Sequence, residues 1–592
     1  MGREKSAVKE TAKIRPLREL FSALSEICPN CFWYVMGYIV LSALLPVFGA
    51  LFLGKLLESL VREEMAKALQ AGIVMAVLFV LTNGLKLFCK YRFDDLFTFF
   101  RMELLNRVGQ KLLHIPYEKI ELSAFWMTHA RVFTGLSGSA EGVERLCNVM
   151  VELLGILSEY LIIDAILCTF SPWYPFFWLL SAVWTIETAK RIVGRQLQSK
   201  EMLIRGERKL EYQNSLCLNL QAKRDIEMYG AENYFAGRGS AVLREIQNAL
   251  FLCRKELKWA ELGTALLRVG VIFICLLGLG SSFVDRNISV ERLTLGLAAA
   301  LLSFSLSNQI EKAGMVYFQQ LDAARDLFLF LRMVDEQKTG VEVYSNANEM
   351  AVEIQNLHFC YPNVAEDTLN GISLRIPKGA HFALVGANGA GKSTLIKCLT
   401  GAYRQYTGEI KYSKALRVAV IYQDNCLYAF PLRENVASTA HGIDDGKVLA
   451  SLSRAGFGGE AAAFGKEQLE GYVLKAVEQG GRIFSGGESQ KLALSRIFYQ
   501  EPDFIILDET NSGLDAFAEE KVIWELTESE NNEVTLLLVT HRLPAVKYFS
   551  IIAVMQNGRI VESGTHEELM AQNGIYAEMY REEAKQFGEE EA

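Results

Sequence analysis

Two glycine-rich stretches of this sequence have the composition of phosphate-binding sites. The first, GANGAGKS at Gly386–Ser393, lies between a short apolar run, HFALVG, and a run with helical spacing, TLIKCLTG. Glycines let backbone N–H groups close around a phosphate, and the N-terminus of the following helix favours negative charge. We therefore expect Lys392 to reach the β- and γ-phosphates of a nucleotide and the Ser393 hydroxyl to hold Mg²⁺. The predicted nucleotide contacts in and after this loop are Gly386, Asn388, Gly389, Gly391, Lys392, Ser393 and Thr394.

A pair of carboxylates follows an apolar run later in the chain. In DFIILDE the run ends at Asp508 and Glu509, where the carboxyl end of a buried parallel strand is expected to meet a ligand. Asp508 is predicted to hold Mg²⁺, directly or through water, and Glu509 to polarise the attacking water. Capping of a strand end is the structural alternative for the pair.

Three further side chains are candidates for the same site. TLLLVTH is predicted to be a strand ending at His541, which would contact the γ-phosphate. In VIYQD a strand is followed by Gln423, a neutral side chain that could contact both the metal and the water. Tyr361 in FCYP is the candidate for stacking on adenine, although a packed tyrosine would look the same in sequence. The predicted catalytic residues are therefore Glu509, His541 and Gln423, the metal ligands Ser393, Gln423 and Asp508, and the cofactors ATP and Mg²⁺.

The second glycine-rich stretch is RIFSGGESQKLALSR, about a hundred residues after the first. It places Ser485, Gly486 and Gly487 directly before a run with helical spacing, a composition that also suits an anion. A single nucleotide pocket does not need two such cradles. The stretch therefore raises the question of whose phosphate it would contact.

The elements around these motifs indicate an α/β domain in the second half of the chain. After a polar stretch at Asp335–Asn348, short β-rich runs alternate with helical ones, the pattern of a sheet flanked by helices. Before that stretch the texture is apolar, and 51% of the whole chain is hydrophobic. The first half is therefore predicted to lie in a membrane.

Six apolar runs before residue 320 approach the length that crosses a bilayer as a helix, about 20 residues. An even number of spans puts both ends of the chain on one side. Lys and Arg are abundant in the N-terminal arm and in the two long connections, so both termini are predicted to be cytoplasmic. The predicted spans are Phe32–Leu53, Leu69–Cys89, Cys147–Phe170, Trp173–Ile192, Ala260–Val284 and Leu293–Asn308.

Two connections of about fifty residues, Lys90–Arg145 and Lys190–Lys258, are rich in helix-favouring residues. The spans are expected to continue through them as helical hairpins outside the membrane. Each hairpin has a break, one at Pro116 and the other near Gly230.

Acidic residues occur inside the third and fourth predicted spans: Glu152, Glu159, Asp164 and Glu187. Charged groups within a membrane are costly unless they face water or a partner, so they are candidates for function. Helix-to-helix hydrogen bonding in a polar cavity is an equally weighted alternative. Glu159 is expected near the bilayer centre, whereas Lys55 and Lys86, near span ends, are expected to extend toward the interface.

The set of motifs resembles the ATP-binding-cassette (ABC) transporters, specifically half-transporters of the six-span exporter type. The resemblance covers nearly the whole chain in order and spacing. Its motifs are the Walker A loop Gly386–Ser393, Gln423 of the Q-loop, the signature FSGGE at Phe484–Glu488, the Walker B strand IILDE, SGLD at Ser512–Asp515, and His541.

The resemblance answers the question raised by the second glycine-rich stretch. In that family the signature of one chain closes over ATP held by the Walker A loop of a partner. By that resemblance Ser485 and Gly487 contact the γ-phosphate of the partner's ATP, Gly486 and Glu488 belong to the same cradle, and Asp515 couples the two sites. Pro116–Glu121 and Ala222–Ala231 resemble the tips of the family's coupling helices. ATP would then favour the closed dimer through differential affinity.

Three residues depart from the family's usual pattern. Glu488 stands where glutamine is usual, and little loss is expected because glutamate also accepts hydrogen bonds. Thr510 replaces a proline after the catalytic glutamate, and Gln479 replaces a glutamate before the signature, which would weaken coupling to a hairpin.

The predicted fold is a six-span α-helical transmembrane domain with long cytoplasmic extensions, followed by an α/β P-loop ATPase domain. Residues 1–30 are assigned to an N-terminal arm with an elbow helix, 31–334 to the transmembrane domain, 335–350 to a linker and 351–592 to the ATP-binding cassette. The expected location is an integral, multi-pass position in a bacterial plasma membrane.

The predicted function is ATP-driven export of an amphipathic drug, lipid or peptide by a dimer, with the acidic spans hinting at a cationic cargo. The dimer partner is a second copy or a related half-transporter. A net charge of −8 argues against nucleic acid as a partner. Alternatives are import of a siderophore-type cargo through the same fold, and a membrane regulator gated by ATP that transports nothing.

Overall fold

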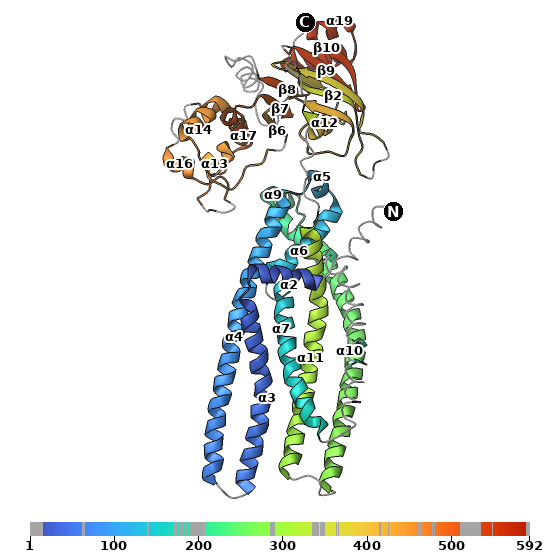
Figure 1. Cartoon of the computed structure of the whole chain (residues 1–592). Helices are drawn as coiled ribbons and strands as arrows, with labels where there is room; N and C mark the ends of the chain where they lie inside the picture. The colour runs from blue at the N-terminus through green and yellow to red at the C-terminus, as the bar shows by residue number, and fades with distance from the viewer. Residues whose placement is uncertain are drawn as a thin grey trace. The chain divides into compact units, whose positions relative to one another are not determined.

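The chain forms two compact units (Figure 1). A helical unit comprises residues 1–115 and 120–335, and an α/β unit comprises residues 116–119 and 336–592. Four residues from the first half of the sequence, Pro116–Lys119, therefore belong to the α/β unit. The computed structural model describes residues 16–61, 65–138, 141–169, 176, 183–184, 187–188, 205–206, 208–284, 290–333, 342–343, 350–362, 364, 366–413, 416–423, 425–458, 465–475, 478, 480–508, 534–547 and 549–587.

The helical unit is built from a few very long helices. At about 1.5 Å per residue, the 49 residues of α4 extend about 74 Å, more than twice the roughly 30 Å hydrocarbon core of a bilayer. These helices must therefore continue outside a membrane. The helices are α2 (Pro16–Ile27), α3 (Cys31–Val61), α4 (Met65–Leu113), α6 (Ser123–Ser137), α7 (Val143–Cys168), α9 (Leu220–Met228), α10 (Glu232–Val284) and α11 (Val290–Leu331).

Four of the six predicted spans coincide with described helices that are long and apolar enough to cross a membrane. These segments are Cys31–Gly49, Gly72–Leu113, Leu262–Ser281 and Arg292–Leu331. The third predicted span lies in α7, a helix that also carries several charged side chains. The fourth, Trp173–Ile192, falls largely outside the described residues.

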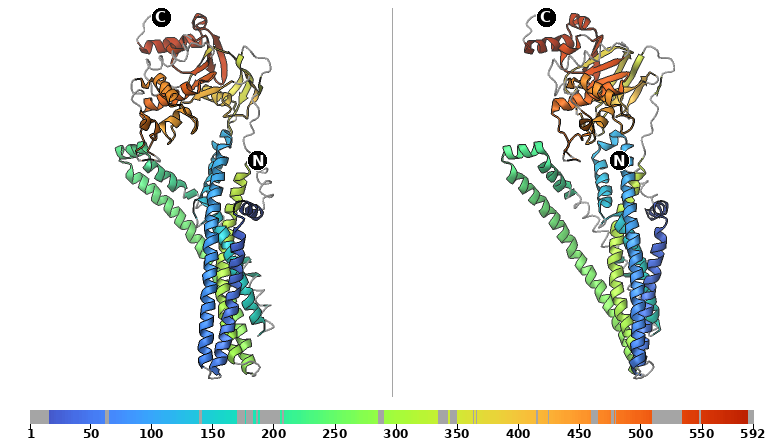
Figure 2. Two further views of the ribbon diagram at one scale, coloured as in Figure 1. Left: turned by 60° about the vertical axis from the view of Figure 1, so that its left-hand side comes forward. Right: turned by 90° about the vertical axis from the view of Figure 1, so that its left-hand side faces the viewer.

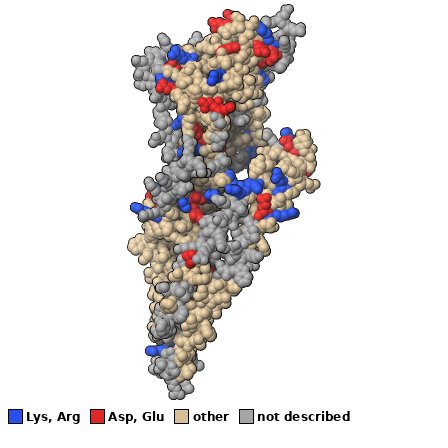
Figure 3. Space-filling view, turned by 90° about the vertical axis from the view of Figure 1, so that its right-hand side faces the viewer, with Lys and Arg blue, Asp and Glu red and all other residues tan. Residues whose placement is uncertain are grey.

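Aromatic side chains of α4 form the core of the helical unit. Phe93, Phe97 and Phe100 are almost completely buried and pack with Leu20 of α2 and Phe330 of α11. Further along α4, apolar side chains such as those of residues 79–81 are more than half exposed. Figure 3 shows few charged side chains over the lower part of this unit. An exposed apolar surface of this kind suits contact with lipid.

Helix α10 separates from the rest of the helical unit along its length. Its C-terminal end packs beside α11, and Figure 2 shows its N-terminal end, together with α9, far from α4 and α11. The turn between α9 and α10 contains the predicted break at Gly230, where φ is +60°. Met228 and Tyr229 at this tip are about three-quarters exposed.

Two sheets form the α/β unit. The larger has the strand order β10-β9-β4-β8-β7-β6, in which β10 is antiparallel to β9 and the other neighbours are parallel. The smaller has the order β1-β5-β2-β3. The strands are β1 (Glu342–Val343), β2 (Met350–Phe359), β3 (Leu369–Pro377), β4 (His381–Val385), β5 (Thr407–Tyr412), β6 (Val418–Ile421), β7 (Phe504–Asp508), β8 (Thr535–Val539), β9 (Ile551–Gln556) and β10 (Arg559–Gly564).

Both faces of the central strand β4 are covered, which explains its continuous apolar sequence. Phe382 and Leu384 point into a core shared with the small sheet and helix α12 (Lys392–Leu399). Ala383 and Val385 point into a second core shared with α17 (Gly486–Gln500) and α20 (Ile575–Phe587).

Shorter helices complete the α/β unit. Helix α5 (Tyr117–Ile120) contributes its first three residues to it. The remaining helices are α13 (Leu432–Ala437), α14 (Asp445–Leu452), η1 (Ser453–Phe457), α16 (Lys466–Glu470), η3 (Leu543–Val546) and α19 (His566–Gln572).

Candidate functional site

The first glycine-rich stretch forms a tight loop between β4 and α12. Gly386, Gly389 and Gly391 have φ values of +151°, +80° and +106°, which L side chains rarely adopt. A Cβ at Gly386 would lie 2.2 Å from the backbone oxygen of Met555, and one at Gly391 would lie 2.8 Å from the Cε atom of the same residue. Only glycine fits these positions, and the resulting loop is a nest for an anion.

Lys392, the first residue of α12, extends back over this loop. Its Nζ atom donates to the backbone oxygens of Gly386, at 2.7 Å, and Ala387, at 3.2 Å. The side chain is 5% exposed, whereas Asn388 and Gly389 on the rim are exposed. A fixed ammonium group at the positive end of a helix gives the loop the charge that a polyphosphate requires.

The other predicted residues follow strands that end at one edge of the sheet. Asp508 is the last residue of β7 and is 4% exposed. Gln423 follows β6 and His541 follows β8, and both are exposed. Because β4, β8, β7 and β6 are parallel neighbours, the phosphate loop and these three residues all lie at the carboxyl edge of the sheet, where such sheets bind ligands.

The oxygen atoms gathered at this edge suit Mg²⁺. A buried carboxylate at Asp508, an exposed hydroxyl at Ser393 and an amide oxygen at Gln423 are hard ligands of the kind that this ion prefers. Glu509 and Asp515, together with the departures at Gln479 and Thr510, lie outside the described residues.

Tyr361 lies beside the phosphate loop rather than deep in a core. It is partly buried, and its hydroxyl is 3.0 Å from Oγ1 of Thr394 on α12. Its ring contacts Phe359 and Tyr403 edge-on, with centroid distances of 5.1 and 5.6 Å. Sequence reasoning missed Tyr403, which is 2% exposed. Its only signal was the aromatic composition of AYRQY after the loop.

The second glycine-rich stretch begins helix α17 with a capping box. The Ser485 Oγ atom accepts from the backbone N–H of Glu488 at 3.3 Å, and a Glu488 carboxylate oxygen accepts from the backbone N–H of Ser485 at 2.8 Å. Arg482 lies 3.4 Å from the same carboxylate. Glu488 thus stabilises the helix start, and its hydrogen bonds with Ser485 lower the pKa of its carboxyl group.

The glycines of this second stretch are not required by backbone geometry. Gly486 and Gly487 are the first residues of α17, and a Cβ at Gly486 would meet nothing within 4 Å. Ser485 and Gly486 are both exposed. The helix N-terminus is therefore an open surface with free room above it, not an enclosed cradle.

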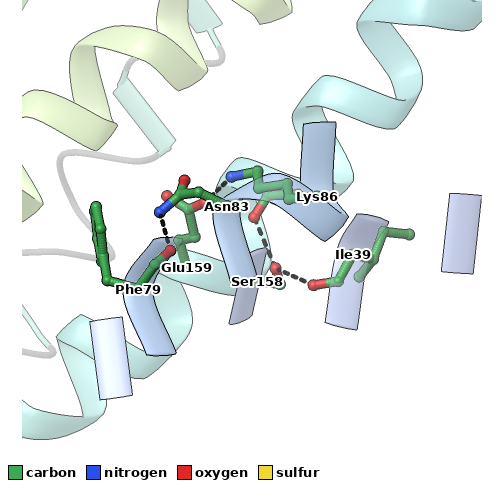
Figure 4. A network of polar contacts seen from close by, with 7 residues as sticks. Ile39, Phe79, Asn83, Lys86, Ser158 and Glu159 are labelled. Atoms are coloured by element: carbon green, nitrogen blue, oxygen red, sulfur yellow. Dashed lines mark hydrogen bonds and ion pairs between the residues drawn. The ribbon is translucent and has the colours of Figure 1, made fainter. Parts of the chain in front are cut away.

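In the helical unit, three acidic side chains of α7 (Glu144, Glu152 and Glu159) are paired with bases of α4. Lys86 Nζ lies 2.7 Å from Glu159, and each side chain is 19% exposed. Figure 4 shows this pair beside Asn83, whose side chain bonds to Phe79, and Ser158, which bonds to the Ile39 carbonyl. The expectation that Lys86 extends toward the interface is therefore wrong, because a carboxylate on the neighbouring helix binds it.

The pairing continues along the interface between α4 and α7. Lys90 lies 3.4 Å from Glu152, which Arg145 also approaches at 3.7 Å. Arg101 and Glu144 form a buried pair at 2.6 Å. Because Glu159 lies level with Lys86, it lies beside the C-terminal end of the apolar run Leu69–Cys89 and not beside its middle.

A second polar cluster joins α7, α10 and α11. Asp164 accepts from the Ser303 hydroxyl at 3.1 Å. Arg268 is paired with Glu311 and also donates to Asn308, and its side chain is 5% exposed. Glu187, the remaining acidic residue singled out in the sequence, is exposed. Helix-to-helix polar contacts, the alternative weighed from the sequence, account for Glu152, Glu159 and Asp164.

The protein-family model described as "ABC transporter" matches residues 369–512. Residues 369–512 are therefore similar to the ABC transporter family. The match spans the phosphate loop, Gln423, the start of α17 and Asp508, and it confirms the predicted ABC-type unit and its binding of ATP.

A solved structure described as a bacterial Atm1-family ABC exporter with ATP bound is similar to this chain over almost its whole length. The TM-score is 0.78, with 96% of this chain and 99% of that chain covered, at 19% sequence identity. At that identity the likeness establishes the fold. It confirms the predicted exporter-type architecture of a helical membrane domain followed by an ABC domain, and with its apolar helices the chain is an integral membrane protein.

Two curated ABC relatives have related sequences. The glutathione/L-cysteine transport system ATP-binding/permease protein CydC of Escherichia coli is 31% identical over 385 residues, covering 62% of this chain and 64% of that protein. The ATP-dependent lipid A-core flippase of Saccharophagus degradans is 32% identical over 283 residues, covering 46% and 47%. The chain thus spans less than two thirds of the length of these relatives.

Proposed function

We propose that this chain is one half of an ATP-driven membrane transporter that works as a dimer and exports an amphipathic compound. One observation carries the proposal. The chain pairs a closed phosphate loop with an open helix start, where Ser485 and Gly486 are exposed and the fold itself does not require glycine at Gly486. Such a surface is suited to close over a phosphate held by another subunit.

Within the site, each residue has a distinct role. Lys392 and the loop N–H groups bind the β- and γ-phosphates, and Tyr361 stacks on adenine. Ser393, Gln423 and Asp508 hold Mg²⁺, which neutralises phosphate charge when bound. Glu509 orients the attacking water and His541 contacts the γ-phosphate, while Ser485–Glu488 and Asp515 serve the partner's nucleotide.

The proposed location is a bacterial plasma membrane with both termini and the ABC domain in the cytoplasm. The assignment of 31–334 to the membrane domain and 351–592 to the cassette is part of the same proposal. Lys and Arg in the N-terminal arm and the long connections support this orientation.

The cargo is proposed to be an amphipathic drug, lipid or peptide. The two relatives are named for transport of glutathione and L-cysteine and for flipping of lipid A-core, so they do not indicate one cargo. The expectation of a cationic cargo now rests mainly on Asp164 and Glu187, because Glu152 and Glu159 already pair with Lys86, Lys90 and Arg145.

Transport is tested in proteoliposomes with outward-facing ABC domains. Fluorescent lipids, dyes and peptides should accumulate inside the vesicles when Mg-ATP is added, and Glu509→Gln should abolish the accumulation. Movement of cargo out of the vesicles when ATP is added would indicate an importer. ATP hydrolysis with no movement of cargo would indicate a regulator.

Partnership is tested by native mass spectrometry of the purified protein together with its ATPase rate. A dimer is expected, formed by two copies or with a related chain. A strictly monomeric protein that hydrolyses ATP at the rate of the dimer would contradict the proposed sharing of sites.

A further inference from the structure

The segment that carries His541 is short and is held firmly where it leaves the sheet. It links the carboxyl end of β8 to the short helix η3. The backbone N–H of Thr540 donates to the Leu384 oxygen of β4 at 3.4 Å, and Thr540 Oγ1 accepts from the backbone N–H of Arg542 at 3.0 Å. Thr540 is completely buried, whereas His541 is exposed. The direction of the His541 side chain therefore depends on how the backbone enters η3.

The start of η3 is bound by Glu583 of α20. A carboxylate oxygen of Glu583 accepts from the backbone N–H of Leu543 at 2.8 Å, from a position 40 residues further along the chain. The first N–H groups of a helix have no partner within the helix. Arg542, at the N-cap, cannot supply one, because an arginine side chain contains no acceptor. Glu583 thus provides the acceptor that this helix start requires.

Helix α20 is itself fixed against the rest of the ABC domain. The carboxylate of Glu562, on β10, accepts from the first two backbone N–H groups of α20 at 2.6 and 2.9 Å. Tyr576 and Tyr580 are buried and share a core with Leu543 of η3. Glu583 lies about two helical turns after Tyr576. A rigid helix therefore presents this carboxylate to the segment after β8.

The same carboxylate lies close to the side chains of that segment. Burial raises the pKa of Glu583, while its hydrogen bond with Leu543 and the nearby side chains of His541 and Arg542 act in the opposite direction. Glu583 is half-buried, and water screens partly buried charges less than exposed ones. Glu583 therefore acts on the charge of the segment as well as on its backbone.

We propose that Glu583 is a positioning residue for His541. The inference rests on the proposed contact of His541 with the γ-phosphate. With Thr540 fixed by β4 and Leu543 bound by Glu583, the backbone on both sides of His541 is held, and its side chain stays at the carboxyl edge of the sheet. Without the acceptor, the backbone at the start of η3 is free to rotate, and His541 loses its fixed direction. The fold survives, because Leu543 is 1% exposed and remains packed in the core.

The experiment compares Mg-ATP hydrolysis by full-length variants in nanodiscs. Glu583→Ala should lower kcat about 10-fold with little change in KM, because misplacement of a reacting group by about 1 Å can cost about 100-fold. Glu583→Gln has an amide oxygen that still accepts from Leu543, so it should retain kcat within about twofold. Glu582→Ala, at the exposed neighbour on the same helix, is the matched control.

A double-mutant cycle separates positioning from a merely structural role. In a His541→Ala background, Glu583→Ala should change the rate by less than about twofold, because residues that act through one another are not additive. A structural role would produce the same loss in both backgrounds. Single-turnover hydrolysis with enzyme in excess resolves the slow rates of the His541→Ala proteins, and thermal unfolding checks that each variant is folded.

The outcomes distinguish this inference from the proposed function. An unchanged kcat in Glu583→Ala, a loss that Glu583→Gln shares, or a loss that persists in the His541→Ala background overturns the positioning role while the transporter still hydrolyses ATP. A wild-type protein that hydrolyses no ATP, or a His541→Ala protein that hydrolyses it at the full rate, refutes the proposed site, and the positioning role with it.

Discussion

The two glycine-rich helix starts of the ABC domain look alike in sequence and differ in structure. At Gly386–Lys392 three glycines adopt positive φ, Met555 lies close to two of them, and a buried lysine folds over the loop. At Ser485–Glu488 the glycines are helical, Gly486 has open space around it, and a capping box binds the N–H groups of Ser485 and Glu488. The first encloses an anion by itself, whereas the second only presents a surface to one.

The difference teaches how one composition can serve two tasks. Glycine in the first loop is required by backbone conformation and by contacts within the chain. Glycine at position 486 is not required in this way, so we expect it to leave room for a phosphate held outside the chain. Measurements of stability and ATPase rate can separate these two reasons for glycine.

The largest effect is expected for Lys392→Ala. Loss of the ammonium group from the enclosed loop should lower the ATPase rate about 100-fold or more, because removal of a preorganised charge contact has that order of effect. The protein should still insert and fold, since the two carbonyls to which the lysine donates belong to its own loop. Lys447→Ala, at a surface ion pair with Glu501, is the control, and persistent turnover in Lys392→Ala would refute the assignment of the loop.

Gly391→Ala and Gly486→Ala sharpen the comparison directly. Gly391→Ala should destabilise the protein by about 1–2 kcal/mol, because it forces an L residue into the left-handed region, and should also abolish ATPase activity. Gly486→Ala should leave stability unchanged or raise it by up to about 1 kcal/mol, yet lower the ATPase rate by blocking close approach of a nucleotide.

Thermal unfolding and ATPase assays of the two glycine variants provide the measurement. Their opposite effects on stability with a shared loss of activity are the expected signature. Full ATPase activity in Gly486→Ala would show that the open helix start contacts no phosphate.

The smallest effect is expected at Glu488. Glu488→Ala removes one half of the capping box and should cost about 1 kcal/mol, whereas Glu488→Gln keeps the hydrogen bond and should cost little. The lowered pKa of Glu488 has a defined sign: its contribution to stability is present above the ordinary glutamate pKa of about 4.3 and is lost as pH falls through the lower, folded-state pKa.

The two Glu488 variants are compared by thermal unfolding between pH 7 and the acid limit of solubility. The wild-type protein should lose its advantage over Glu488→Ala only in acid, and Glu488→Gln should not show that change. A Glu488→Ala protein as stable as the wild type at pH 7 would contradict a capping role.

Much of the architecture could be predicted because its signals are local. The phosphate loop lies between a strand and a helix within about 20 residues. The parallel strands that precede Gln423 and His541, and the one that ends at Asp508, are short apolar runs. Long apolar stretches likewise predicted four apolar helices, two of them with nearly the observed bounds, whereas Gly72–Leu113 and Arg292–Leu331 continue more than 20 residues beyond the predicted spans. Hydrophobic periodicity and glycine spacing act over single elements, so one sequence is enough to read them.

Pairings between distant elements could not be predicted. The bond of Lys86 to Glu159 joins residues 73 positions apart, and that of Glu118 to Gln405 joins residues 287 apart. A lone acidic residue in an apolar run gives no indication of the base that will neutralise it.

The sequence by itself determined which residues can bind phosphate and which helices are apolar, because side-chain chemistry and short-range backbone conformation are properties of a few neighbouring residues. Tertiary structure alone decided that three acids of α7 are paired, that Glu583 binds the backbone after His541, and that the second glycine-rich helix start is open. Those facts depend on packing between elements far apart in the chain, where the free energy of each contact is set by what surrounds it.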